Sequence, residues 1–225
     1  MPLPRFGGEA LKFLRALKRN NRREWFNAHR DEYEAHVREP MIAIIERLAD
    51  DLRAFAPELV ASPKVSMYRI YRDTRFSENK APYKTHVAAI FPCRGLPKHE
   101  GAGLYFHVSP DEVWAGGGMY APQTPQLHAV REHIAGNVHR LRSIVESPAF
   151  RRTVGRLEGE RLRRVPRGFA TDHPAAEYLK FRQFLAGREF PPRFATSPRF
   201  YRGLLRIFRL VAPLSRFLNE PLLKG

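Results

Sequence analysis

The sequence predicts an α+β fold, in which a central, mainly antiparallel β-sheet of about four to six strands is packed by N-terminal and C-terminal helices. Apolar residues repeat at three- and four-residue intervals in the first third of the chain and again near its end. The middle instead holds short runs rich in β-branched and aromatic residues, separated by turn formers. With 225 residues and 43% hydrophobic content, residues 1–225 are expected to form one globular domain.

Three helices are expected in the first third of the chain. Leucines recur at threefold spacing in the first, and the Asn-Asn pair that follows interrupts the pattern. Asn21 suits the cap of a second helix, because Glu24 stands three residues later and can bind the free amides in return. Pro40 suits the first turn of a third helix.

The strands are predicted in the middle of the chain. Their expected ranges are 64–72, 86–92, 103–109 and 112–120, with a further edge strand at 161–169. The sequence Ser-Pro-Asp-Glu at 109–112 is typical of a hairpin turn, which favours antiparallel pairing. In the third strand, Phe106 would lie on one face of the sheet while Tyr105 and His107 lie on the other.

The remaining elements are predicted to be helical. Thr124 and Pro125 suit the start of a helix that runs to about residue 145 and is weakened by Gly136. The later helices are expected near 147–155, at 173–185 and at 200–211.

The charge balance favours an anionic partner. The chain carries 39 Lys and Arg against 23 Asp and Glu, a net charge of +16, although a general preference for arginine would raise the charge without any ligand. Cys93, the only cysteine, excludes an internal disulfide. No signal peptide or membrane span is apparent, so a cytoplasmic location is expected, and the oligomeric state is not indicated.

The segment from Arg69 to Thr85 holds five cations and only two carboxylates. Like charges about 4 Å apart repel by ~4 kcal/mol each at an effective dielectric of twenty, so this surplus calls for a negative partner. Asp73 can neutralise one arginine through a bidentate bond. The predicted site for a phosphate-bearing or carboxylate-bearing small molecule consists of Arg69, Arg72, Arg75, Lys80 and Tyr83.

Two other interpretations of this segment remain open. Carboxylates from the first helices (Asp31, Glu32, Glu34 and Glu39) could fold onto the loop and form a purely architectural ion-pair network. If the protein is an enzyme, Asp73 is the first candidate for an acid or base, and the cations would stabilise negative charge in the transition state.

Two further features could complete such a site. Gly116, Gly117 and Gly118 end a predicted strand shortly before the helix cap at Thr124. The free amides at the start of that helix suit a phosphate. Glycines at a strand end also mark bulges or tight packing, so this alternative remains open. His107 is a candidate acid or base beside Asp73, although a single histidine in a strand is commonly a packing residue. No histidine pair has metal-binding spacing, so no metal site is expected, and no cofactor is identified.

The C-terminal part supports a different class of function. From Lys180 to Gly225 there are ten Lys and Arg against two acids. Arg202, Arg206 and Arg209 would line one face of a helix, which suits a nucleic acid backbone or an acidic membrane surface as well as plain solvent exposure.

The sequence Arg-Ile-Tyr-Arg-Asp-Thr-Arg-Phe-Ser-Glu-Asn-Lys-Ala-Pro-Tyr at 69–83 resembles a pattern of the uncharacterised bacterial family catalogued as domain of unknown function 2461. The positions that match are Arg69, Arg72, Asp73, Arg75, Phe76, Asn79, Lys80 and Tyr83. The stretches at 20–26, 116–122 and 164–169 are also similar to the family, so the resemblance spans nearly the whole chain. It implies no established activity. Asn79 stands where relatives commonly have aspartate, which argues against a catalytic carboxylate there.

Overall fold

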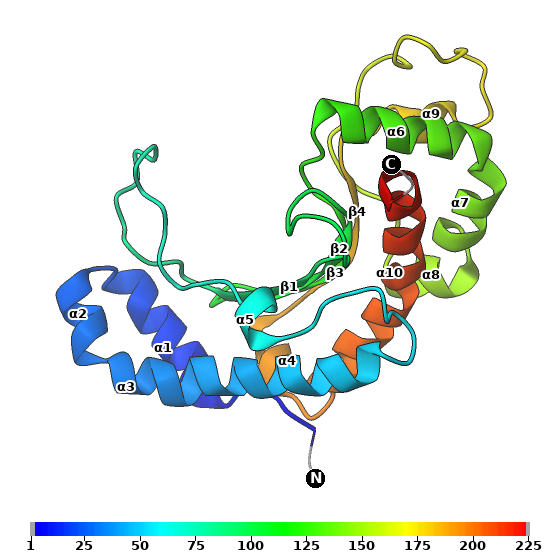
Figure 1. Cartoon of the computed structure of the whole chain (residues 1–225). Coiled ribbons are helices and arrows are strands. Elements are labelled where there is room, and N and C mark those ends of the chain that lie inside the picture. Colours follow the sequence, from blue (N-terminus) through cyan, green and yellow to red (C-terminus); the bar gives the residue numbers. More distant parts are fainter. Residues whose placement is uncertain (1–2, 224–225) are drawn as a thin grey trace.

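The computed structural model describes residues 3–223. Within these residues the chain forms a four-stranded sheet in the order β1-β2-β3-β4, and each neighbouring pair is antiparallel. The strands are β1 (Val87–Phe91), β2 (Gly103–Val108), β3 (Val113–Met119) and β4 (Phe184–Phe190). Helices from both ends of the chain pack beside this sheet, which confirms the predicted α+β class (Figure 1).

Three of the predicted strands are confirmed as β1, β2 and β3, and the predicted hairpin turn is closed by the Ser109 amide, which donates to the Glu112 carbonyl at 2.9 Å. The predicted strand at 64–72 is wrong. Its first residues form the short helix α5 (Pro63–Ser66), because proline suits a first helical turn and the Ser62 hydroxyl accepts the Val65 amide at 3.3 Å. The rest of the predicted strand, residues 67–72, makes only isolated β-bridges, at Met67 and Tyr71.

The fourth strand was not predicted. A helix was expected over 173–185, but only α9 (Ala176–Leu179) is helical there, and the chain then enters β4. Seven residue pairs link β4 to β3, and these tertiary contacts outweigh the local helical spacing. The predicted edge strand at 161–169 is also wrong, since it provides a single bridge between Arg161 and Phe181.

The N-terminal helices form one layer at the end of the molecule that holds the N-terminus (Figure 1). They are α1 (Gly8–Arg19), α2 (Arg23–Ala28), α3 (Arg30–Tyr33), the π-helical turn η1 (Glu34–Arg38) and α4 (Glu39–Leu52). Pro40 lies in the first turn of α4, as predicted, although α3, η1 and α4 follow one another without a break. Proline has no amide proton and crowds the preceding turn, and the wider π-turn before it accommodates both effects.

Asn21 does not cap α2, whose cap residue is Arg22. Its side chain instead pairs with the backbone of Tyr83, 62 residues later. The Asn21 amide donates to the Tyr83 carbonyl at 2.9 Å, and its oxygen accepts the Tyr83 amide at 3.0 Å. These two hydrogen bonds hold the segment before β1 against the N-terminal helices.

The C-terminal helices lie on one side of the sheet, where the last of them packs directly against the strands and the others pack around it. They are α6 (Thr124–Gly136), α7 (Val138–Val145), α8 (Pro148–Thr153), the 3₁₀ turn η2 (Pro192–Thr196) and α10 (Phe200–Leu223). From α10, the Phe208 ring packs 5.5 Å from the Phe91 ring and 6.4 Å from the Phe106 ring, measured between centroids. Among the described residues, no helix lies across the opposite face of the sheet (Figure 1). No helix within residues 3–223 has both the length and the apolar character needed to cross a bilayer.

Asn219 of α10 fixes the chain just before β2. Its oxygen accepts the Ala102 amide at 2.7 Å, its amide donates to the Ala102 carbonyl at 2.8 Å, and the residue is 1% exposed. Asn219→Ala would leave both backbone groups buried without partners, so we expect it to lower the free energy of unfolding by about 2–4 kcal/mol. Urea denaturation measures this. The exposed control Asn79→Ala should change it by less than about 0.5 kcal/mol, and equal urea midpoints for the two variants would contradict the expectation.

Candidate functional site

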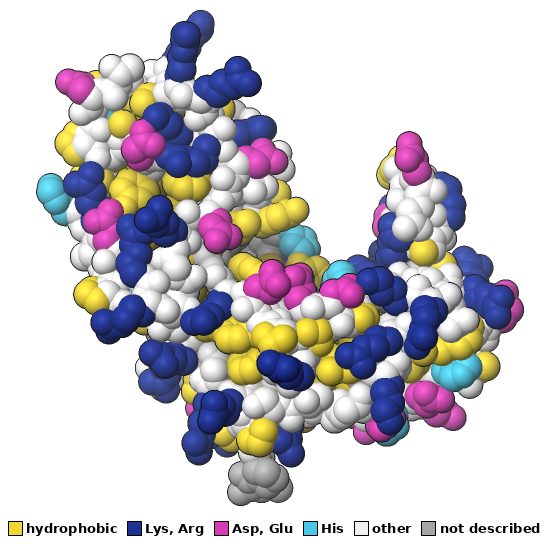
Figure 2. Space-filling model, turned by 180° about the vertical axis from the view of Figure 1, so that it is seen from behind, with side chains coloured by type: hydrophobic (Ala, Val, Ile, Leu, Met, Phe, Trp, Pro, Cys, Tyr) yellow, Lys and Arg dark blue, Asp and Glu magenta, His cyan; other side chains and the backbone are white. Residues whose placement is uncertain are grey.

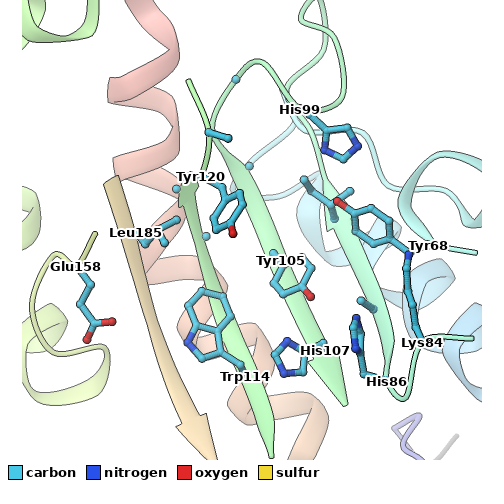
Figure 3. A pocket seen from close by; sticks show the side chains of 17 residues that line it. Tyr68, Lys84, His86, His99, Tyr105, His107, Trp114, Tyr120, Glu158 and Leu185 are labelled. Carbon is cyan, nitrogen blue, oxygen red and sulfur yellow. The ribbon is translucent and has the colours of Figure 1, made fainter. Parts of the chain in front are cut away.

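The face of the sheet opposite α10 holds a pocket of about 680 Å³ (Figure 3). Because strand side chains alternate, Ala88 of β1, Tyr105 and His107 of β2, and Trp114 of β3 all point to this face. The segment before β1 closes one side with Tyr68, Lys84 and His86, and the β1–β2 connection adds His99. Figure 2 shows the surrounding hollow from behind, with histidine and hydrophobic side chains visible in it.

The glycine run of β3 makes room for the Trp114 indole. A Cβ on Gly116 would lie 2.6 Å from an atom of this ring, and a Cβ on the paired Gly187 of β4 would collide with the ring. Gly117 and Gly118 also line the pocket. The structure therefore places all three predicted glycines inside a strand that is paired on both sides, where close packing of the sheet requires them.

Aromatic rings form a continuous wall along the pocket. The Tyr105 ring lies 5.9 Å from the Trp114 ring, 5.7 Å from the His107 ring and 6.3 Å from the Tyr68 ring, between centroids. Tyr68 in turn stacks on His99 at 5.9 Å. Such spacings are typical of interacting aromatic pairs, so the rings form one connected apolar wall that offers both ring faces and ring edges.

The histidines of the pocket favour their neutral forms. Burial lowers the pKa of His107, and the Glu112 carboxylate, whose oxygen lies 3.1 Å from the His107 Nε2, partly opposes this. Burial, with His107 and Lys84 nearby, lowers the pKa of His86 to about 4. Neutral imidazoles can accept or donate a proton, and Glu112 fixes the orientation of the His107 ring.

The low pKa of His86 predicts a loss of stability in acid. Between pH 6.5 and pH 4 the unfolded chain binds a proton at His86 that the folded chain does not, so the free energy of unfolding falls as the pH falls through this window. After allowance for solvent screening, we expect about 2 kcal/mol from this residue. Urea denaturation at several pH values should therefore show a smaller acid loss for His86→Gln than for the unmodified protein. Parallel pH profiles for the two proteins would contradict the assignment.

Lys84 supplies a positive charge at one end of the pocket. Its Nζ lies 4.9 Å from the centroid of the Tyr68 ring, and the Nζ of Lys98 lies 4.6 Å from the same ring. Burial lowers the pKa of Lys84, and Arg69 and Lys98 contribute to the shift. Within residues 3–223 no carboxylate pairs with Lys84, whereas Glu158 lies at the opposite end of the pocket (Figure 3).

The predicted anion-binding loop is folded onto itself and projects from the body of the molecule (Figure 1). Arg75 makes the predicted bidentate bond to Asp73, with nitrogen–oxygen distances of 3.1 and 2.8 Å. The Arg72 guanidinium donates to the Ser77 hydroxyl at 3.3 Å. Lys80 donates to a backbone carbonyl of the same loop at 3.1 Å. Much of the binding capacity of these cations is therefore directed within the loop.

The other predicted site residues lie apart from this loop or from one another. Tyr83 is 3% exposed and stacks on Phe26 of α2 at 4.1 Å, while the exposed Arg69 borders a separate shallow hollow beside α2 and α3. Within residues 3–223 no hydrogen bond or ion pair joins His107 to Asp73, and the His107 Nε2 instead lies 3.1 Å from a Glu112 oxygen in the pocket. The Arg75 contact lowers the pKa of Asp73 to about 2, which makes this carboxylate a weak base.

The architectural alternative required ion pairs from the first helices to the loop. Within the described part of the chain, no ion pair joins the loop to the four carboxylates named for that role, and Glu34 pairs with Arg38 on its own helix at 3.1 Å. The segment is instead held by aromatic packing, in which Tyr71 lies 5.4 Å from Tyr83 between ring centroids. Among residues 3–223, no group of three His, Cys, Asp or Glu side chains is arranged to hold a metal ion.

The sequence prediction missed most of the pocket. Lys84 was counted as a loop cation, and Tyr68, His86 and Trp114 were assigned no role. The alternation of Tyr105 and His107 was the available signal, because two polar rings facing away from a core mark the second face of a sheet.

A scan against protein-family models matched the conserved hypothetical protein family DUF2461 over residues 9–217. Comparisons with curated proteins and with solved structures found no match. The family match covers nearly the whole chain and confirms the resemblance carried by residues 69–83. The protein therefore belongs to the DUF2461 family of conserved hypothetical proteins.

Proposed function

We propose that the protein binds a small organic anion with a flat aromatic or conjugated ring, in the pocket on the open face of the sheet. The observation that carries this proposal is the combination of an aromatic wall with the ammonium of Lys84, which no carboxylate of residues 3–223 pairs with. Pockets of this kind, mostly apolar with a few convergent polar groups, are typical of small-molecule sites.

The aromatic wall selects for the ring. The centroids of the Trp114 and Tyr105 rings lie 5.9 Å apart, and the two rings are tilted relative to each other. A flat ligand can therefore make offset-stacked or edge-to-face contacts with them. The pocket volume of about 680 Å³ lies within the range of about 300–1,000 Å³ that is usual for small-molecule sites.

Lys84 selects for the negative group. Its ammonium is partly buried, so its attraction for a carboxylate or phosphate is less screened than that of an exposed lysine. Glu158 at the other end repels an anion, which favours one orientation with the negative group at Lys84. The loop cations Arg72, Arg75 and Lys80 are weaker candidates because they already bind groups of their own loop.

The fluorescence of Trp114 provides the test. The chain has two tryptophans, and Trp25 stacks on His29 in the N-terminal helices, so Trp25→Phe leaves Trp114 as the reporter. We expect phenyllactate and phenyl phosphate to change its fluorescence saturably, and a neutral benzyl alcohol control to bind more weakly. Fluorescence that does not respond to either anion would contradict the proposal.

The arginines of α10 support a second candidate, binding of a nucleic acid backbone. Arg202, Arg206 and Arg209 are exposed, and none pairs with a carboxylate within residues 3–223. If they bind phosphates, affinity for single-stranded DNA should fall with salt with a log–log slope of about 0.7 per contacted phosphate. The slope should become shallower in Arg202→Ala/Arg206→Ala. An unchanged slope in this variant would contradict the assignment to α10.

A further inference from the structure

We infer that Lys84 is a nucleophilic amine that condenses with an aldehyde or ketone group of the bound ligand to form an imine. The inference rests on the proposed function, and it narrows the ligand class to aromatic or conjugated carbonyl compounds with a nearby anionic group, such as aromatic 2-oxo acids. Amines of this kind serve as covalent catalysts for carbonyl substrates.

The position of Lys84 leaves its amine free to react. Figure 3 shows the side chain between Tyr68 and His86 at the edge of the pocket, and its Nζ lies over the Tyr68 ring. Within residues 3–223 this Nζ has no hydrogen-bond or ion-pair partner. By contrast, the Nζ of Lys98 donates to the Val65 carbonyl at 2.5 Å, and that of Lys80 is bound within its own loop.

The surroundings of Lys84 favour the unprotonated amine. The charged groups that face it are the cations Arg69 and Lys98, and its other neighbours are the rings of Tyr68 and His86. Burial and these two cations lower the pKa of Lys84, so a larger fraction of its amine is nucleophilic near neutral pH than for an exposed lysine. Burial in an apolar pocket and a neighbouring cation are the two usual means of activating such a lysine.

The proposed step conserves atoms and needs no redox partner. The lone pair of the Lys84 Nζ forms a bond to the carbonyl carbon, and a proton passes from nitrogen to oxygen to give a carbinolamine. The hydroxyl group of the carbinolamine then takes up a proton from solvent, the carbon–oxygen bond breaks, water leaves, and a protonated carbon–nitrogen double bond remains. The protonated imine keeps a positive charge where Lys84 had one, so the attraction for the ligand's anionic group persists.

Reductive trapping tests the inference. The full-length protein is incubated with phenylpyruvate and sodium cyanoborohydride, and the modified peptide is identified by mass spectrometry. Phenyllactate carries a hydroxyl group in place of the ketone and is the matched ligand that cannot form an imine. Lys84→Arg retains the charge without a condensing amine, and Lys12→Arg changes an exposed lysine of α1.

We expect one reduced adduct, on Lys84, in the unmodified protein and in Lys12→Arg, and none in Lys84→Arg, whose binding of phenyllactate is measured in parallel. If both ligands bind but no adduct forms at Lys84, or if adducts spread over exposed lysines, imine formation is overturned while the binding function stands. If neither ligand changes Trp114 fluorescence, the proposed function fails and the inference falls with it.

Discussion

Lys84→Ala is expected to weaken the binding of phenyllactate by about 10- to 150-fold, because a hydrogen bond to a charged group contributes about 1.5–3 kcal/mol. Lys84 is the one lysine or arginine among the described residues that line the pocket, and its removal leaves Glu158 as the remaining strong charge there. An anion would then lose its partner and retain a repulsive carboxylate. Isothermal titration calorimetry or the Trp114 fluorescence change would measure the loss.

Two further variants locate the effect. Lys84→Arg should retain affinity within a few-fold, since it preserves the charge at the same place. Lys80→Ala removes an exposed cation of the projecting loop and should leave affinity unchanged. Equal losses of affinity in Lys80→Ala and Lys84→Ala would indicate that the anion binds at the loop, which would contradict its assignment to the pocket.

Gly118→Ala should have the largest effect on stability, lowering the free energy of unfolding by at least about 3 kcal/mol. Gly118 has φ of +123°, which residues with a Cβ rarely adopt, and an added Cβ would collide with the Phe184 carbonyl oxygen of β4. The backbone of a paired strand cannot move aside without breaking ladder hydrogen bonds. Urea and thermal denaturation would measure the change.

Gly136→Ala is the matched control. This glycine ends α6, and nothing lies within 4 Å of an added Cβ. Alanine favours helix over glycine, so Gly136→Ala should raise stability by about 0.5–1 kcal/mol. Opposite signs of the stability change in Gly118→Ala and Gly136→Ala would show that the sheet packing requires a glycine at position 118, whereas the helix tolerates alanine at position 136. A Gly118→Ala protein as stable as the unmodified one would contradict the described packing of β3 on β4.

Local patterns predicted the parts of the fold that local forces determine. The short runs of β-branched and aromatic residues in β1, β2 and β3 and the apolar face of α10 are visible in the sequence. The strand β4 was missed because residues 173–185, which run into it, have helical spacing. Only the pairing with β3 decides between a helix and a strand there. Asn21 likewise has the chemistry of a helix cap, yet it binds the distant backbone of Tyr83.

The candidate site was only partly predictable for the same reason. A bidentate bond from Asp73 to one nearby arginine was predicted from the sequence, and the structure identifies that arginine as Arg75, two residues away. Lys84 lines the same pocket as Tyr105 and Trp114 because the segment before β1 passes along the edge of the sheet. The path of that segment cannot be predicted from residue spacing. The positive charge of residues 69–84 was therefore recognised, but the partly buried Lys84 was assigned to the loop instead of the pocket.

A crystal structure of the protein with phenyllactate would test the central claim most directly. The pocket assignment predicts ligand density between Trp114 and Lys84, with the carboxylate at the Lys84 Nζ and the ring against the aromatic wall. Density at Arg72, Arg75 and Lys80 on the projecting loop, with the pocket empty, would contradict it.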